Sequence, residues 1–258
     1  MEVIKKGSKS EDVKKLQQCL GILVDGDFGN TTEILVKDFQ KKHNLVQDGI
    51  VGPKTWDKLL QETNMNNLDI TYQPIDVNIT KSLNRKIKYL VIHYTAGTSS
   101  KSGEALKNSK SFCKTKSSAD FCVDDETIIQ VNPDIRNYYC WAVGDGKGKN
   151  GIYNKDCVSI EICSNLKKKT TYKKPNHSGW SFTDESLNKA LNLSKYIMNV
   201  YDIPLKNVIR HFDVSGKSCP GIIGWNTSSL FNETSGEKLN EKNNETEWLK
   251  FKEELSKK

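Results

Sequence analysis

Two histidines and one cysteine have the spacing and the setting of metal ligands. His93 ends the predicted buried strand KYLVIH (88–93), and His211 ends a second, shorter predicted strand, VIRH (208–211). Cys219 follows eight residues later, 219 − 211 = 8, in the turn-rich stretch HFDVSGKSCPG (211–221). Buried strands of α/β folds collect their ligands at their carboxyl ends. Two imidazoles and one thiolate suit a catalytic zinc ion and leave its fourth position open.

The alternative is that His93 and His211 are core histidines with satisfied ring nitrogens and that Cys219 is a buried thiol. Two strand-end histidines together with a Cys-Pro-Gly turn favour the metal site, but the residue types alone leave both interpretations open. The chain has two other histidines, His43 in a helical region and His177 in a stretch rich in Lys, Pro and Gly. We expect both of these at the surface.

A hydrolytic zinc site also needs a base for the attacking water and a group that stabilises the oxyanion. The strand CVSIEIC (157–163) alternates, so that Glu161 and Ser159 face away from its apolar side. Glu161 is the best candidate for the base, and Lys217, two residues before the cysteine, is the candidate for the oxyanion contact. A solvated strand glutamate and a surface lysine are the alternatives. Asp213 is a candidate hydrogen-bond partner of a ligand histidine.

Strand and helix signals alternate around these residues. The segments FCVD and TIIQVN, on either side of Asp124-Asp125, predict a β-hairpin. Thr183 caps a long helix with apolar residues at helical spacing, and Pro204 ends it. A polar insertion at 226–244 precedes a final segment, EWLKFKEELSKK, whose apolar face is expected to pack back on the domain. This order of elements predicts an α/β domain.

The first sixty residues contain an internal repeat. DGDFGNTT (25–32) matches DGIVGPKT (48–55) at an offset of 23 residues, 48 − 25 = 23. Each copy is a Gly-rich loop that leads into a helix, and a third helix precedes both. We therefore expect a three-helix domain over 1–62, a polar linker over 63–79 and the α/β domain over 80–258.

The net charge of the chain favours one class of binding partner but does not identify the partner. Its 258 residues carry a net charge of +7, and the sequence pI is about 8.9. This favours a polyanionic partner, such as a nucleic acid, an anionic membrane or an acidic wall polymer, or serves solubility alone. The start, MEVIKKGSKSED, has no apolar signal-peptide core, and no stretch approaches the roughly 18 apolar residues of a membrane span. We expect synthesis in the cytoplasm without a signal peptide and no membrane insertion. Seven cysteines without a CxxC pair argue against a disulfide framework.

Five motifs, in order, resemble the zinc-dependent N-acetylmuramoyl-L-alanine amidases of the amidase-2 type, a group that includes many phage endolysins. The motifs are VIHYTAG, SADFCVDD, CWAVGDGKGKNGI, VSIEIC and RHFDVSGKSCPG, within about residues 80–225. The resemblance implies a mixed central sheet flanked by helices and one zinc ion per chain. It also implies hydrolysis of the amide that joins the lactyl group of N-acetylmuramic acid to L-alanine of the stem peptide.

The first unit resembles the three-helix peptidoglycan-binding domain found on many wall hydrolases, with the DGxxG repeat as its mark. The partner implied is bacterial peptidoglycan, gripped by its glycan or its stem peptide, which raises the effective concentration of substrate. Anionic, phosphate-bearing wall polymers then match the positive charge, and no nucleic acid is needed to explain it. The place of action implied is the cell wall, reached after holin-type or lytic release.

By motif position the resemblance assigns His93, His211 and Cys219 as zinc ligands. It assigns Glu161 as the carboxylate that activates water, and Lys217 as the contact to the carbonyl oxygen or oxyanion. A rival within the same fold is a zinc-containing peptidoglycan recognition protein that binds without cutting. Such proteins typically lose the cysteine ligand, which is present here.

The remaining substrate contacts and the departures from the family pattern lie in two other motifs. Trp141 and the glycine-rich loop that begins with Gly144 and Asp145 would line the substrate groove, as similar loops do. Many relatives carry a histidine or large aromatic residue where this chain has Ala119-Asp120, and a histidine where it has Ala142. Proton transfer is then expected to depend more on the candidate base, Glu161.

An alternative function, nucleic-acid binding, rests on the net charge alone. It predicts an affinity that falls steeply as the salt concentration rises.

Overall fold

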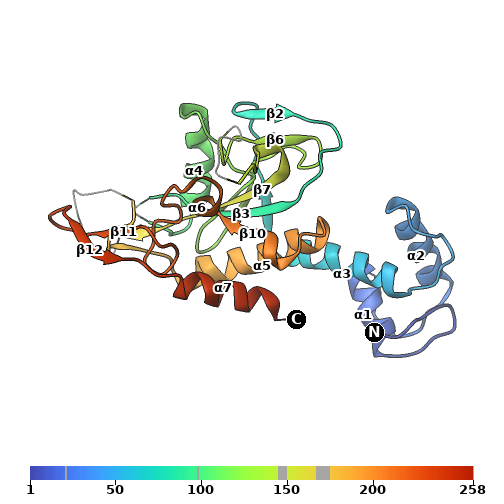
Figure 1. Cartoon of the computed structure of the whole chain (residues 1–258). Helices are drawn as coiled ribbons and strands as arrows, with labels where there is room; N and C mark the ends of the chain where they lie inside the picture. The colour runs from blue at the N-terminus through green and yellow to red at the C-terminus, as the bar shows by residue number, and fades with distance from the viewer. Residues whose placement is uncertain (21, 98, 145–149, 167–174, 258) are drawn as a thin grey trace. The chain divides into compact units, whose positions relative to one another are not determined.

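The chain folds as two units with separate hydrophobic cores, Met1–Asn67 and Leu68–Lys258. The structure is a computed structural model, shown in Figure 1, and it describes residues 1–20, 22–97, 99–144, 150–166 and 175–257, with the backbone alone for 61–67. In the described residues, no helix has the length and apolar character needed to span a membrane.

The first unit consists of α1 (Glu11–Leu20), α2 (Asn30–Lys42) and α3 (Pro53–Asn67). Pro53 is the first residue of α3, where its missing N–H costs no helical hydrogen bond. The helices and loops bury one apolar cluster: Ile4, Val13, Leu16, Phe28, Val36, Val51, Trp56 and Leu59. The three predicted helices therefore form, around a small core of their own.

The second unit is built on a six-stranded sheet in the order β1-β5-β4-β7-β3-β10. Neighbouring strands are parallel except for the antiparallel pair β4 and β5, which is the predicted hairpin. The strands are β1 (Ile70–Tyr72), β3 (Tyr89–Tyr94), β4 (Phe121–Val123), β5 (Ile128–Gln130), β7 (Cys157–Ile162) and β10 (Val208–Arg210). The predicted α/β fold with a mixed central sheet is confirmed.

Helices cover both faces of this sheet. In Figure 1, α5 (Asp184–Val200) and α7 (Thr246–Ser256) lie together below the strands, and α4 (Glu104–Ser111) lies above them. The short helix α6 (His211–Ser215) packs through Val214 on Val91 of β3, whose side chain faces away from the main core. The lower face holds the main core, where Ile92 and Ile160 pack with Ala190 and Phe251. Because side chains alternate along a strand, the neighbouring residues His93 and Glu161 face the other side.

The two long helices follow their sequence signals. The hydroxyl of Thr183 accepts a hydrogen bond from the backbone N–H of Ser186 and caps α5, as predicted. The buried residues of α7 are Trp248, Phe251 and Leu255, so the final segment packs back on the sheet domain as expected.

The predicted linker at 63–79 differs from the structure. Helix α3 continues to Asn67, and β1 then joins the edge of the sheet in parallel with β5. Edge pairing needs only backbone groups on one side, and β1 is largely exposed, so its polar surroundings concealed the strand. The sheet unit therefore begins at Leu68 rather than at residue 80.

Shorter elements complete the second unit. The polar insertion at 226–244 contains a two-stranded hairpin rather than an irregular loop. The remaining elements are β2 (Ile79–Lys81), β6 (Tyr138–Cys140), β8 (Asn165–Leu166), β9 (Trp180–Ser181), β11 (Ser229–Phe231), β12 (Lys238–Lys242), and the 3₁₀ turns Phe112–Lys114, Asn154–Asp156 and Leu205–Asn207.

A buried carboxylate ties β4 to β7 beneath the candidate site. Asp120 Oδ2 accepts hydrogen bonds from the backbone N–H and the hydroxyl of Ser159, both at 2.8 Å, and its Oδ1 accepts one from Asn132 at 2.6 Å. The guanidinium of Arg85 lies 3.7 Å from Oδ1, and both side chains are almost fully buried. Asp120, a departure from the family pattern, thus holds the strand that carries Glu161.

We predict that Asp120→Ala lowers the free energy of unfolding of the second unit by about 3–5 kcal/mol, because it removes the counter-charge of the buried Arg85 guanidinium and the acceptor of three hydrogen bonds from Ser159 and Asn132. Glu126→Ala, which removes an exposed carboxylate from the β4–β5 turn, should change it by less than about 0.5 kcal/mol. Urea denaturation measures both. Equal losses in the two variants would contradict this account of the network.

Candidate metal centre

The register of two central strands brings His93 and Glu161 together. Strands β3 and β7 are parallel, and His93 lies opposite Glu161 in their ladder. Side chains of paired residues point to the same face of a sheet, so imidazole and carboxylate are neighbours there. This follows from the alternation that the sequence shows.

His211 reaches the same face from a helical turn. It is the first residue of α6, not the last residue of the preceding strand as predicted. Arg210 and Asp213 bracket this turn: the Arg210 backbone N–H donates to Asp213 Oδ2 at 2.8 Å, and its guanidinium donates to both carboxylate oxygens. Asp213 therefore positions His211 through Arg210, and within the described part of the chain its carboxylate accepts no hydrogen bond from His93 or His211.

The loop from His211 to Cys219 is closed by backbone hydrogen bonds. The N–H of Phe212 donates to the carbonyl of Cys219 at 2.9 Å, and the N–H of Cys219 donates to the carbonyl of Lys217 at 2.7 Å. In β3, the backbone N–H of Tyr94 favours the thiolate form of Cys219, but burial outweighs this effect on its pKa. The closed loop keeps the thiol close to both histidines.

The three side chains form one compact donor set. Cys219 Sγ lies 3.7 Å from His93 Nδ1, the two imidazole ring centres are 4.8 Å apart, and one ligand atom from each residue lies within 4.8 Å of the others. His93, His211 and Cys219 are 2%, 9% and 4% exposed. In the described part of the chain, His93 Nε2 and Glu161 Oε2 are buried without a hydrogen-bond partner. Such a set fits a divalent cation better than it fits satisfied core histidines.

The electrostatics of the site suit metal ligation. Burial lowers the pKa of His93 well below its usual value, and burial together with the charge of Lys217 lowers the pKa of His211 to about 4. Both imidazoles are therefore neutral near pH 7, which is the form that binds metals. Burial raises the pKa of the Cys219 thiol, so a thiolate there needs a nearby cation.

The candidate base has a carboxyl suited to proton transfer. Burial raises the pKa of Glu161 to about 8, and the positive charge of Lys217 opposes that rise. A group with a pKa near neutrality both accepts and returns a proton efficiently. Lys217 itself is exposed on the loop, close enough for its charge to act on the carboxyl and on the histidines.

One predicted substrate-binding segment borders the same face. Val143 and the partly buried Ala142 pack with Val91 of β3 and Val214 of α6. Trp141 is partly exposed, and its indole N–H donates to the hydroxyl of Thr80 at 2.9 Å. Gly144 adopts a left-handed conformation at φ 80°, and Asp145 lies outside the described residues. Their contact with substrate remains a prediction.

The structure also gives the positions of the two other histidines and of a buried arginine that the sequence did not suggest. His177 is fully buried against Trp180, with ring centres 4.9 Å apart, so its expected surface position is wrong. His43 is half-buried and packs on Phe39. Arg210 was missed because an arginine after two apolar residues gives no signal of burial; its donors reach Asp213, Glu245 and the carbonyl of Trp225.

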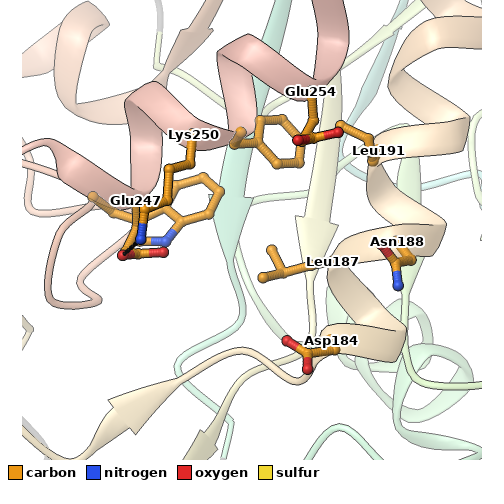
Figure 2. Close-up of a pocket in the computed structure, with 9 residues that line it drawn as sticks. Asp184, Leu187, Asn188, Leu191, Glu247, Lys250 and Glu254 are labelled. Atoms are coloured by element: carbon orange, nitrogen blue, oxygen red, sulfur yellow. Dashed lines mark hydrogen bonds and ion pairs between the residues drawn. The ribbon is translucent and has the colours of Figure 1, made fainter. Parts of the chain in front are cut away.

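A separate cavity of about 300 Å³ lies between α5 and α7, on the opposite side of the sheet (Figure 2). Leu187 and Leu191 of α5 line it together with Trp225 and Phe251, and the charged residues of α7 border it. None of the residues that line it is a histidine or a cysteine. Among the described residues, the candidate metal ligands lie together on the face that carries His93.

Comparisons with known proteins agree with this division of the chain. Residues 83–222, more than half of the chain, match the family "N-acetylmuramoyl-L-alanine amidase". Residues 9–59 match a peptidoglycan-binding domain family.

Individual relatives are similar over about half of the chain. The amidase CwlH of Bacillus subtilis is 34% identical over 135 residues, covering 51% of this chain and 46% of the relative. The amidase CwlA of the same species is 31% identical over 137 residues, covering 52% and 43%. A solved mutant endolysin from Bacillus subtilis aligns with a TM-score of 0.45 and 30% identity over 58% of this chain and 88% of that one. The chain thus spans less than half the length of these curated relatives.

Proposed function

The chain belongs to the N-acetylmuramoyl-L-alanine amidase family, and from that premise we propose that it hydrolyses the amide between N-acetylmuramic acid and L-alanine in bacterial peptidoglycan. The observation that carries the proposal is the convergence of His93, His211 and Cys219 beside Glu161 on one face of the sheet. Water adds to the lactyl carbonyl carbon, the C–N bond breaks, and the products are a carboxylate on the sugar and a free amine on L-alanine.

The metal proposed is zinc, one ion per chain, held by His93, His211 and Cys219. Two neutral imidazoles and a thiolate are ligands that zinc prefers, and three protein ligands leave a position open for catalysis. A bound zinc ion supplies Lewis-acid polarisation and lowers the pKa of a coordinated water.

The protein's own groups handle the proton and the developing charge. We assign Glu161 as the base that takes a proton from the attacking water and then returns it to the departing amine of L-alanine. Its place opposite His93 in the sheet, with a buried Oε2 that has no hydrogen-bond partner among the described residues, supports this role. The ammonium of Lys217, on the loop between two ligands, stabilises negative charge as it builds on the carbonyl oxygen.

The first unit is proposed to bind peptidoglycan and hold the second unit near its substrate. Anionic wall polymers are the proposed partners of the net positive charge. The proposed place of action is the bacterial cell wall, reached by a holin-type or lytic route. A role in recognition without cleavage is disfavoured, because the three proposed ligands lie together and Glu161 is paired with one of them in the sheet.

The reaction predicts its own products. Cell walls digested with the purified protein should gain free L-alanine amino groups without any gain of reducing sugar. End-group analysis of the walls measures both. New reducing ends would indicate a glycosidase, and new D-alanine or diamino-acid termini would indicate a peptidase; either result contradicts the proposal.

The ligands and the base should behave differently when replaced. His93→Ala, His211→Ala and Cys219→Ala should lose both zinc and activity, because three ligands leave none to spare. Glu161→Gln keeps the shape but cannot accept a proton, so activity should fall by roughly 10²–10⁴-fold with zinc retained. Lys217→Ala should keep zinc and lose mainly turnover.

Metal analysis beside kinetics on the same preparations separates these outcomes. Near-full activity in Glu161→Gln would show that another group transfers the proton. Loss of zinc from that variant would make Glu161 a ligand instead.

Catalysis and wall binding should be separable, with catalysis in the second unit and wall binding in the first. Residues 68–258 alone should still hydrolyse small soluble muropeptides, because the site lies entirely within that unit. Residues 1–67 should bind walls without cutting them. A folded 68–258 fragment that is inactive on soluble substrate would show that the first unit helps to build the active site.

A further inference from the structure

Each copy of the loop repeat in the first unit is held by a buried glutamine. In the first copy, the side-chain amide of Gln17 donates to Asp25 Oδ1 at 2.6 Å and to the carbonyl of Asp27 at 3.1 Å, and its oxygen accepts from the N–H of Gly26 at 2.8 Å. The glutamine thereby fixes all three residues of the turn.

The second copy repeats this pattern bond for bond. Gln40, at 40 − 17 = 23 residues further on, donates to Asp48 Oδ1 and to the carbonyl of Ile50, both at 2.9 Å, and accepts from the N–H of Gly49 at 2.9 Å. The two loops therefore share one backbone frame, and a difference between them lies in the side chains that the frame presents.

The side chains make one position polar in the first copy and apolar in the second. Asp27 in the first copy forms an ion pair with Lys9 at 2.8 Å. Its counterpart in the second copy is Ile50, which lines a cavity of about 370 Å³ together with Leu45, Val46 and Pro53. A cavity of this size falls at the lower end of the range for small-ligand sites, about 300–1,000 Å³.

The lining indicates the chemistry of a ligand. Three aliphatic side chains and a proline ring suit methyl groups, and no aromatic ring lines the cavity among the described residues. A sugar ring, by contrast, packs its flat C–H face best on an aromatic ring. Lys54 adds a cation for which the described residues show no ion-pair partner, and Asp48 adds an anion already fixed by the turn. A short peptide with methyl groups and a free carboxylate fits this combination.

We propose that the cavity of the second loop copy binds the stem peptide of peptidoglycan, with alanine methyl groups against Val46 and Ile50 and a peptide carboxylate at Lys54. The inference rests on the proposed function. It places wall binding in the second of the two similar loops, and it names the peptide rather than the glycan as the part of the wall that is bound.

The test uses the full chain and a soluble stem pentapeptide, L-alanyl-γ-D-glutamyl-L-lysyl-D-alanyl-D-alanine. This probe lacks muramic acid and hence the amide of the proposed reaction, so its binding is independent of catalysis. Val46→Asp should weaken binding at least tenfold by placing a carboxylate against the methyl groups. The matched control is Leu23→Asp, the same position of the first copy (46 − 23 = 23), which should change binding less than twofold. These side chains are 77% and 80% exposed, so neither change should disturb the fold.

A second pair of variants tests the carboxylate contact. Lys54→Ala should weaken binding severalfold and reduce its dependence on salt, whereas Thr31→Ala, its counterpart in the first copy, should not. A pentapeptide with amidated carboxyl groups should bind the parent about as weakly as the free peptide binds Lys54→Ala, and that variant should not distinguish the two peptides.

Calorimetric titration of each variant gives the result. Equal weakening by Val46→Asp and Leu23→Asp, or binding of a chitin oligosaccharide or poly(glycerol phosphate) in the cavity in place of the peptide, would overturn the inference. Wall hydrolysis with no pentapeptide binding would defeat this inference alone. Pentapeptide binding without hydrolysis would defeat the proposed reaction and leave the peptide site standing.

Discussion

A thiol buried beside two neutral imidazoles is the arrangement on which the chemistry proposed for the second unit depends. Burial disfavours the charged form of Cys219, and the imidazoles of His93 and His211 carry no charge to stabilise it. A divalent cation reverses this balance, because it favours a thiolate and needs neutral imidazoles. The site is preorganised, because each donor group is held in place by contacts within the protein that do not involve a metal ion.

Those contacts come from different levels of structure. His93 is fixed by the ladder of a central parallel strand, where a slip of one residue would turn it to the opposite face. His211 and Cys219 belong to one short loop, closed at Phe212 and anchored by Arg210. The guanidinium of Arg210 also binds Glu245, next to α7, so the loop is tied to the far end of the chain. Preorganisation of this kind reduces the cost of assembling a metal site.

The sequence could predict those features that depend on residues close together in the chain. Alternation along a strand is local, so the facing of Glu161 and the strand position of His93 were readable from CVSIEIC and KYLVIH. The burial of His177 could not be predicted in the same way. His177 packs on the nearby Trp180, but it is also bridged to Phe231, which lies far away in the sequence. The edge strand β1 was missed for a related reason: its partner lies some sixty residues away, and its own residues are mostly exposed.

The central claim is that one zinc ion is bound by two histidines and one cysteine, and X-ray absorption at the zinc edge tests it most directly. For the purified full chain, the account predicts one sulfur at about 2.3 Å and two imidazole nitrogens at about 2.0–2.1 Å, with one further light atom completing four ligands. The sulfur should disappear from the spectrum of Cys219→Ala. A zinc environment without sulfur, or one with several sulfurs drawn from the other cysteines, would contradict it.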